Sequence, residues 1–310
     1  MAVKTYSLQN LPVDQWRELI GDSLLSSPEF LSLWCTPGGR GEVVCDERNG
    51  QFVSGMAGVI FGNGFLGRFE SMPRSLPGGL FFAGNLDEQQ RRDSARRIIA
   101  AISGKGHLRM VINSTDRIFG ELGFSKKIMS THTIELKGFT PGKKVQEHMR
   151  AADRRGGEVK EVVPEDNDAL YGLAVESNKR HGRKLPYSRE FFRNMIELSQ
   201  QDSRLLILKV VCEDRPVAFR ISVIESDHLI NWQLYIDDRY SNIKPGVLLM
   251  KRVLETAEKK KLQNLNMGSS PEEAESLKRY KESWGGKEIT IPYYVKHSMI
   301  GRILYGLRGK

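Results

Sequence analysis

Cysteine and histidine are scarce in this sequence. The 310 residues include three cysteines, Cys35, Cys45 and Cys212, and six scattered histidines. No two cysteines form a CxxC pair, and the histidines lack the close spacing that zinc sites use. The sequence therefore predicts neither a disulfide framework nor a metal site.

Long apolar runs are also absent. No segment approaches the roughly 18 uninterrupted apolar residues of a membrane helix, and the first residues lack the order of a signal peptide. We therefore expect a cytoplasmic protein without a transmembrane segment. Near the end, Met299, Ile300, Ile303, Leu304 and Leu307 share one helical face. This face predicts docking on the core, with a peripheral contact to the inner membrane face as the alternative.

A nucleophile–base pair is missing as well. His132, His181 and His228 have no serine, cysteine or aspartate at a spacing that marks a covalent catalytic dyad. We interpret these histidines as structural and expect no covalent enzyme intermediate.

Positive charge is what the sequence has in excess. The formal net charge is +9, in a chain with 39% hydrophobic and 27% charged residues, which is a globular composition. Residues 141–310 hold 31 Lys and Arg against 24 Asp and Glu, so this part carries +7 of the total. A basic half favours an anionic partner such as a phosphorylated cofactor, an RNA or an acidic carrier protein. A solvated basic surface explains the charge equally well.

The same order of helices and strands is predicted twice. In the first half, strand-like runs within 41–71 precede a helix over 87–103, a strand over 107–113, a short helix over 115–124 and a strand over 131–138. The second half has predicted helices over 167–180 and 191–200, strands over 204–214, 215–226 and 228–237, a helix over 247–261, a strand over 262–268 and a helix over 275–286. This recurrence suggests duplication. We expect two domains, 1–140 and 141–310, joined near residues 138–144, where Pro141 and Gly142 interrupt regular structure.

One segment of the second half resembles a known motif. IDDRYSNIKPGVLLMKRVLETAEKKKLQNLNMG, residues 236–268, looks like the central motif of GNAT (N-acetyltransferase) enzymes: a strand, a turn of the form RGxGxG/A and a helix. In that family the turn and the helix N-terminus hold the pyrophosphate of coenzyme A. Gly246 aligns with a loop glycine and Lys244 adds a cation. The usual arginine–glycine pair is replaced by Ile243 and Lys244, which tells against coenzyme A.

Further motifs resemble the FemAB-like branch, also called BioF2-like acetyltransferases, in the family's order. They are VQEHMRAADRRGGEV, SNKRHGRKLPYSREFF, the KPG turn, and NMGSS followed by LKRYKESWGG. The resemblance covers residues 145–295 and implies an α/β (α+β) fold. We expect two tandem GNAT-like domains, each with a mixed, mostly antiparallel central sheet flanked by helices. The first half lacks an RGxG signature in PRSLPGGLFF, so we expect a degenerate domain there and the chemistry in the second.

The resemblance also implies site residues. Catalytic roles are expected for Tyr235 and Asp237, donor binding for Lys244, Gly246 and Val247, and substrate contacts for Arg180, Trp232, Tyr280 and Lys281. Taken alone, aromatic residues such as Trp232 and Tyr235 on a strand more often pack in the core, and only their place just before the loop favours a site role. An exposed loop explains the basic run at 179–184 equally well.

The implied reaction is direct attack of an amine on an activated acyl group, without a tightly bound cofactor. Acyl-CoA, aminoacyl-tRNA and an acylated carrier protein remain open as the donor, or co-substrate. No inserted arm of two long helices is visible, which favours a BioF2-like transfer to an amine of a cell-envelope or exopolysaccharide precursor over a tRNA-dependent one. The alternative from another class is a non-catalytic module that binds RNA or an acidic partner in a basic cleft.

Overall fold

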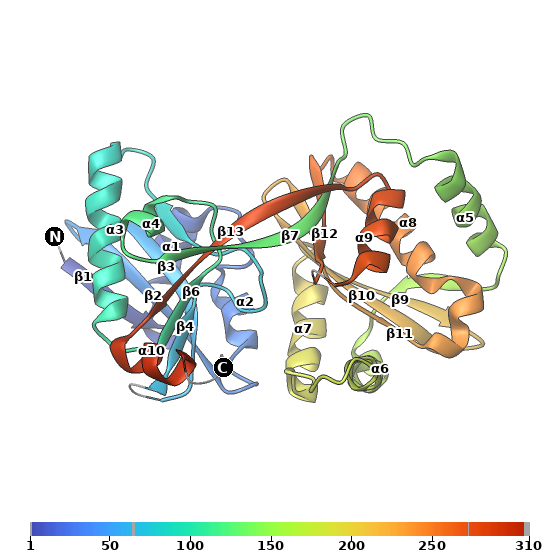
Figure 1. Cartoon of the computed structure of the whole chain (residues 1–310), viewed down its shortest axis with the longest axis horizontal. Coiled ribbons are helices and arrows are strands. Elements are labelled where there is room, and N and C mark those ends of the chain that lie inside the picture. Colours follow the sequence, from blue (N-terminus) through green and yellow to red (C-terminus); the bar gives the residue numbers. More distant parts are fainter. Residues whose placement is uncertain (1, 64–65, 272, 307–310) are drawn as a thin grey trace. The chain divides into compact units, whose positions relative to one another are not determined.

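The computed structural model describes residues 2–63, 66–271 and 273–306 (Figure 1). The chain forms two compact units, and the boundaries between them lie inside two strands. Unit 1 comprises residues 1–129 and 291–310, and unit 2 comprises residues 130–290. Leu307, which the sequence places on the last apolar helical face, lies outside the described residues.

Unit 1 is a mostly antiparallel sheet with helices. Its strands follow the order β1 (Ala2–Ser7), β2 (Gly39–Arg48), β3 (Gln51–Phe61), β4 (Arg68–Glu70), β6 (Arg109–Ile112) and the end of β13 (Lys287–His297), with β5 (Leu80–Phe82) paired to β3. Its α-helices are α1 (Val13–Ile20), α2 (Pro28–Leu33), α3 (Glu88–Ser103), α4 (Ile118–Glu121) and α10 (Met299–Gly306). Only β4 and β6 pair in parallel among the registers described for this unit.

Unit 2 repeats this plan. Its strand order is the end of β7 (Ser125–Glu135), β12 (Asn264–Ser269), β11 (His228–Ile236), β10 (Arg215–Glu225), β9 (Leu205–Cys212) and β8 (Glu158–Glu161). Its helices are α5 (Lys143–Asp153), α6 (Asn167–Arg180), α7 (Arg189–Gln201), α8 (Pro245–Lys259) and α9 (Glu275–Ser283), with short 3-10 turns η3 (Pro164–Asp166) and η4 (Asp238–Ile243). As in unit 1, one described pair is parallel, that of β11 and β12.

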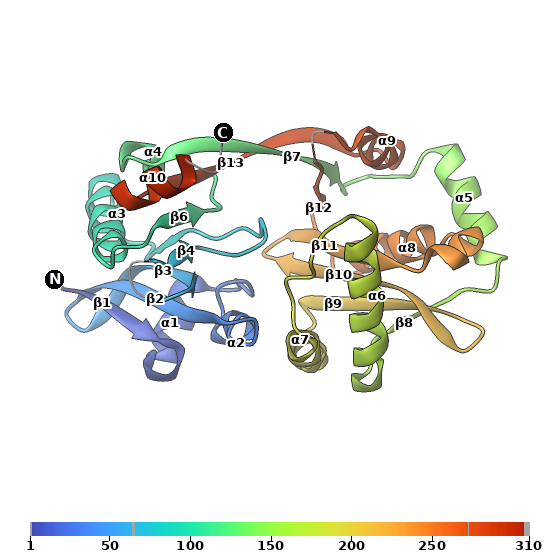
Figure 2. The ribbon, with the colours of Figure 1, turned by 60° about the horizontal axis from the view of Figure 1, so that its bottom comes forward.

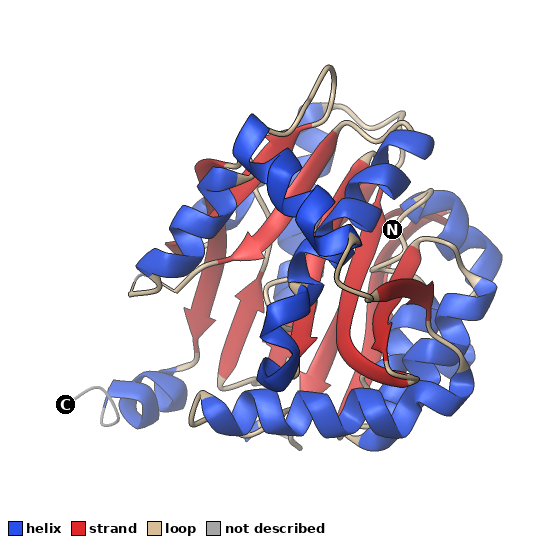
Figure 3. Cartoon of the chain, turned by 90° about the vertical axis from the view of Figure 1, so that its right-hand side faces the viewer, coloured by secondary structure: helices blue, strands red, loops and turns tan. Residues whose placement is uncertain are grey.

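The helices of unit 2 cover both faces of its sheet (Figures 2 and 3). On one face, Phe192 of α7 packs edge-on against Tyr235 of β11, with ring centroids 6.2 Å apart. On the other face, Asn231 of β11 points toward Met250 of α8. The two faces therefore present different side chains to any ligand.

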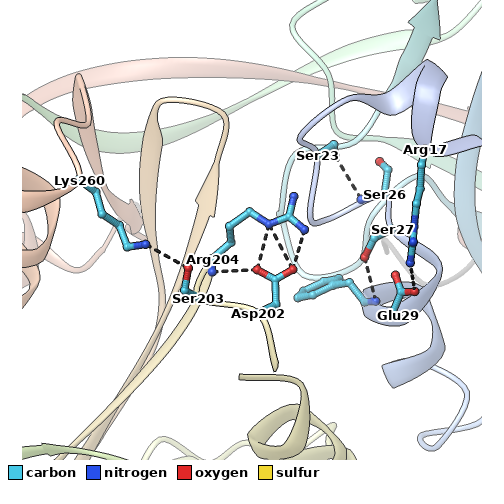
Figure 4. Close-up of polar contacts among 10 residues, drawn as sticks. Arg17, Ser23, Ser26, Ser27, Glu29, Asp202, Ser203, Arg204 and Lys260 are labelled. Atoms are coloured by element: carbon cyan, nitrogen blue, oxygen red, sulfur yellow. Dashed lines mark hydrogen bonds and ion pairs between the residues drawn. The ribbon is translucent and has the colours of Figure 1, made fainter. Parts of the chain in front are cut away.

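Local polar contacts set several element ends (Figure 4). In unit 1, the Ser27 hydroxyl accepts from the Phe30 amide at 3.2 Å and caps α2. In unit 2, Asp202 pairs with Arg204 where α7 turns into β9, and this pairing lowers the pKa of Asp202. Lys260, just after α8, donates to the Ser203 hydroxyl at 3.1 Å.

The helix predicted over 87–103 is confirmed and shows how the sequence determines an element. Asp87 is its N-cap and accepts from the Gln90 amide at 2.8 Å, while the Gln90 side chain accepts from the Asp87 amide. Ile98, Ile99 and Ile102 are buried on one face. The short strands β1, β5 and β8 were not predicted, because runs of three to six residues carry little periodic signal.

The observed units differ from the expected division at 140/141. The segment 138–144 lies within unit 2, and the last part of β13 lies within unit 1, where Tyr294 pairs with Ile112 of β6. The end of β7 in turn pairs with β12 in unit 2, with Ile134 opposite Leu265. Composition shifts and turn residues do not reveal such pairings, because they are made between residues far apart in sequence.

The expected docking of the last apolar face on the core is wrong for the residues described. Met299, Ile300, Ile303 and Leu304 are all exposed. The residue of α10 that faces inward is Gly301, where an added Cβ would lie 2.1 Å from the Leu108 carbonyl oxygen. Close backbone approach at a glycine thus orients this helix, in place of its apolar stripe. Within the described residues, no helix has the length and apolarity required to cross a membrane.

Candidate functional site

The two parallel strands of unit 2 pair only at their beginnings. Residues 228–230 of β11 lie opposite residues 264–266 of β12, and the described register stops there although β11 continues to Ile236. Gly268, with φ at +82°, still lies close to Asn231, because an added Cβ would be 2.7 Å from the Asn231 carbonyl oxygen. Beyond these residues no register between the two strands is described, so they part toward the end of β11, from which η4 leads into α8.

The N-terminus of α8 follows the end of β11 through the turn η4. Lys244 has left-handed backbone angles, and Pro245 occupies the first helical turn. The amides of Val247 and Leu248 both donate to the Lys244 carbonyl, at 3.0 and 3.3 Å. Of the residues expected to bind the donor, Gly246 therefore offers its amide, whereas the amide of Val247 is already bonded.

The matching helix of unit 1 has a different N-terminus. In α3, the Asp87 carboxylate occupies the positive end of the helix dipole. In α8, the N-cap is Lys244 and no side chain caps the helix. A phosphate thus meets a carboxylate at α3 but an uncapped helix end at α8.

Arg180, at the end of α6, reaches the end of β11. Its guanidinium donates to the Ile236 carbonyl at 2.7 Å and pairs with Asp238. The side chain is 37% exposed and so remains accessible to solvent. The structure therefore brings Arg180 to the same strand end as Lys244 and Gly246, since Gly246 lies against Ile236.

Asp237 is occupied by structural contacts. Both carboxylate oxygens accept from the Arg239 guanidinium, at 2.9, 3.1 and 2.6 Å, and one accepts the Arg239 amide. These hydrogen bonds hold the pKa of Asp237 below its usual range. A carboxylate stabilised in its charged form is a weak proton acceptor, so these contacts do not support the expected catalytic role.

Trp232 and Tyr235 belong to an aromatic cluster on the α7 side of the sheet. Tyr187 and Phe191 pack against the Trp232 ring, with centroids 5.9 and 6.4 Å away. The Tyr235 hydroxyl donates to the Gln233 side chain at 3.2 Å, and Tyr235 is 3% exposed. Both residues therefore pack against other aromatic rings, which is the alternative to substrate contact that the sequence analysis gave for them.

Lys281 lies on the opposite face, in α9, and is 3% exposed. Its ammonium donates to the Gly268 carbonyl, to the Ser269 carbonyl at 3.2 Å and to the Ser270 hydroxyl at 2.8 Å. Burial, with a smaller contribution from the charge of Arg220, lowers the pKa of Lys281 to about 8. Lys281 thus ties α9 to the end of β12 and titrates near neutral pH.

Two further buried groups adjoin Lys281. Tyr280, expected from the sequence, packs against Trp284 with ring centroids 6.2 Å apart, and burial raises the pKa of its hydroxyl. Arg220 of β10 interacts electrostatically with both Tyr280 and Lys281 and is 5% exposed. Our sequence analysis missed Arg220. The available signal was a single arginine inside the otherwise apolar strand RPVAFRISVIES.

Around the separation of β11 and β12, the structure thus gathers two polar groups of residues. One is a cationic helix end with Lys244, Gly246 and Arg180, and the other is a buried pair of cations, Arg220 and Lys281. Such an arrangement can hold an anionic donor at the helix end. Its buried cations can stabilise negative charge that develops on the reacting acyl group. Among the described residues, no group of three or more His, Cys, Asp or Glu is placed to hold a metal ion.

Residues 143–282 match the family described as an acetyltransferase (GNAT) domain, which places a GNAT domain within unit 2. No curated protein sequence matches the chain. The match thus gives unit 2 an acyltransferase domain of the GNAT type.

Solved structures extend the similarity to the whole chain. FemX has a TM-score of 0.70 at 10% identity, covering 100% of both chains. The structure of L-PGS from Bacillus licheniformis has a TM-score of 0.60 at 13% identity, covering 96% of this chain and 95% of the other. A tandem GNAT protein of the clavulanic acid biosynthesis pathway has a TM-score of 0.57 at 9% identity, covering 96% and 98%. The chain therefore has the tandem GNAT fold shared with FemX, and the expected fold class is confirmed.

Proposed function

We propose that unit 2 transfers an acyl or aminoacyl group from an activated, anionic donor to an amine by direct attack. The observation that carries this proposal is the parting of β11 and β12 in front of the uncapped N-terminus of α8, inside the segment that matches the GNAT domain. An uncapped helix end can bind a phosphate, and we place the acyl chain where β11 and β12 no longer pair.

For the donor, we propose that Gly246 supplies a backbone amide and that Lys244 and Arg180 supply cations. All three lie at the end of β11. The amide of Val247 already donates to the Lys244 carbonyl, so we propose that Val247 helps to form the first turn of α8 and does not itself donate to the donor phosphate. The missing arginine–glycine pair leaves acyl-CoA, aminoacyl-tRNA and an acylated carrier protein as donors to be compared.

For the chemistry, we propose that Lys281 exchanges a proton with the reacting amine. A general base works best when its pKa is near the working pH, and the pKa of Lys281 is about 8. Tyr280 beside it would contact the substrate. Trp232 and Tyr235 lie on the other face of the sheet, in contact with α7, and we assign them to holding β11 in place.

The test is a donor panel. The purified chain is incubated with acetyl-CoA, aminoacyl-tRNA or acylated carrier protein, each with an amine-bearing cell-envelope precursor, an aminosugar polymer or a simple amine. Products are identified by mass spectrometry. Transfer from one donor is expected, rising with pH through about 8 and lost in Lys281→Met. Absence of transfer from every donor, together with steeply salt-dependent binding of RNA, would favour the non-catalytic alternative.

A further inference from the structure

Arg220 lies in the middle of the sheet of unit 2 without a counterion among the described residues. Arg220 lies on β10, where its backbone is opposite Leu208 of β9 on one side and Leu234 of β11 on the other. Although the side chain is 5% exposed, no hydrogen bond or ion pair to its guanidinium is present in the described chain, and its Nε atom is fully buried. Burial lowers the pKa of Arg220. Unpaired buried charges are costly and therefore rare.

The other buried cation of this sheet shows the usual arrangement. Lys209, on the neighbouring strand β9, is 9% exposed and pairs with the buried Asp166 at 2.6 Å. Arg220 instead interacts with a second cation, Lys281, and with the neutral Tyr280. Two buried positive charges near each other repel, so an anion would be stabilised beside them.

The hydrogen-bond donors of the Lys281 ammonium are all in use. An ammonium has three N–H donors, and Gly268, Ser269 and Ser270 supply three acceptors to Lys281. Arg220 has five donors in a planar fork that matches a carboxylate or phosphate. The available donors of this pair therefore belong to Arg220.

The side chain opposite Arg220 on β11 is partly exposed to solvent. Leu234 lies directly opposite Arg220 in the register of β10 and β11, so the two side chains share one face. Leu234 is 37% exposed, although it lies on an interior strand of the sheet. It also lies beyond Ile230, where β11 has parted from β12. A ligand approaching from this side would meet Leu234 beside Arg220.

We propose that Arg220 is the anion-binding residue of the acyl-transfer site and that its guanidinium takes an anionic oxygen of the reacting substrates. This inference rests on the proposed function. The oxygen has two sources, a carboxylate or phosphate that a substrate carries, or the oxyanion that forms when the amine attacks the acyl carbonyl. In the second case, the C–N bond forms as the carbonyl π electrons move to oxygen. They return as the C–S or C–O bond to the donor breaks, the amine nitrogen gives a proton to neutral Lys281, and the donor leaves as a thiol or hydroxyl after taking up a proton.

The first experiment needs no substrate. Thermal unfolding of the wild type, Arg220→Met and the matched control Lys209→Met is followed at constant ionic strength, with and without inorganic phosphate or acetate. Arg220→Met removes an uncompensated charge and is expected to raise the Tm by about 2 °C or more. Lys209→Met leaves the buried Asp166 carboxylate without its cation and is expected to lower the Tm. A loss of stability in Arg220→Met as large as that in Lys209→Met would overturn the proposal, because it would make Arg220 a structural residue.

The anions distinguish the two sources. If the oxygen belongs to a carried carboxylate or phosphate, one of the anions raises the Tm of the wild type and of Lys209→Met but not of Arg220→Met. With the donor that the panel identifies, Arg220→Lys then raises KM. If the oxygen is the oxyanion, the anions have no such effect and Arg220→Lys lowers kcat about 100-fold with KM nearly unchanged.

The two proposals fail in different ways. Unchanged kcat and KM in Arg220→Lys, on an enzyme that turns over, would refute the role of Arg220 and leave acyl transfer intact. Anion stabilisation that depends on Arg220, without turnover of any donor, would refute acyl transfer and leave the anion site intact.

Discussion

Buried charged side chains in this protein follow two patterns. Asp46 in β2 is fully buried and accepts from Arg97 at 2.6 Å and from the Ser94 hydroxyl at 2.6 Å. Lys209 is paired with Asp166 in the same way. Arg220 and Lys281 depart from this pattern, because they interact with each other. Proteins keep such unfavourable groups where function requires them.

The lowered pKa of Lys281 predicts how stability depends on pH. A lysine whose pKa falls from 10.5 to about 8 on folding binds fewer protons in the folded state than in the unfolded state between these values. Unfolding then takes up protons in this window, so rising pH stabilises the folded chain. Between about pH 7 and about pH 9.5, the free energy of unfolding of the wild type should rise by about 2 kcal/mol relative to Lys281→Met.

Chemical denaturation of both proteins at several pH values measures this difference. The Lys278→Met variant is the control, because Lys278 lies one turn earlier in α9 and pairs with the exposed Glu275 at 3.3 Å. Its stability should follow that of the wild type at every pH. A difference between wild type and Lys281→Met that stays constant across the window would show that Lys281 titrates normally.

At the scale of elements, the two helices α3 and α8 occupy matching places and differ at their first residues. Asp87 caps α3 with a carboxylate and closes its positive end. Lys244 begins α8 with a left-handed backbone and no capping side chain. The position of both helices could be predicted from apolar periodicity, whereas the left-handed angle at Lys244 could not, since it depends on how η4 enters the helix.

Lys244→Gly separates the backbone role of this residue from its charge. Glycine adopts left-handed angles without a steric penalty, so stability should be unchanged or up to about 1 kcal/mol higher. Affinity for the anionic donor should fall about 10-fold, because a cation is lost near the phosphate. Donor titration and thermal unfolding measure the two effects.

Lys261→Gly is the matched control. Lys261 follows the other end of α8 and has the same left-handed φ, 54° against 55° for Lys244. Its replacement should have the same effect on stability and none on donor affinity. Equal loss of affinity in both variants would show that net charge, and not the site at Lys244, attracts the donor.

At the scale of the whole molecule, each unit takes a strand segment from the opposite half of the chain. Residues 291–297 of β13 belong to unit 1, with Tyr294 2% exposed against its core. Residues 130–135 of β7 belong to unit 2, with Ile134 1% exposed in its core. A cut at the middle of the sequence therefore removes a core strand from both units.

This exchange predicts which fragments fold. Residues 130–290 contain every strand segment of unit 2 and should unfold cooperatively when expressed alone. Residues 141–310 lack Ile134 and the other β7 residues that pair with β12, and should be destabilised by several kcal/mol, which is about the cost of losing a buried leucine-sized side chain and a strand. Circular dichroism melts of the two fragments measure the difference. Equal cooperativity would mean that the pairing of β7 with β12 contributes little.

The sequence by itself determined most of the elements and, through a family resemblance, the class of the second domain. Apolar periodicity located the main helices, glycine-bounded runs located most strands, and the segment 236–268 indicated the GNAT motif, because these signals lie within one turn, strand or loop. It also placed Lys244, Gly246 and Arg180, which the structure brings to one strand end.

Only the tertiary structure decided the rest. The exchange of β7 and β13 depends on pairing between residues far apart in the chain, which no local pattern encodes. The carboxylate of Asp237, expected to act in catalysis, pairs with Arg239 in the turn after β11. The two residues are near in sequence, but the direction of their side chains is set by packing. Arg220 is a candidate site residue because it lies near a second cation and has no counterion among the described residues. The environment of a buried charge exists only once the chain has folded, so the sequence could not reveal it.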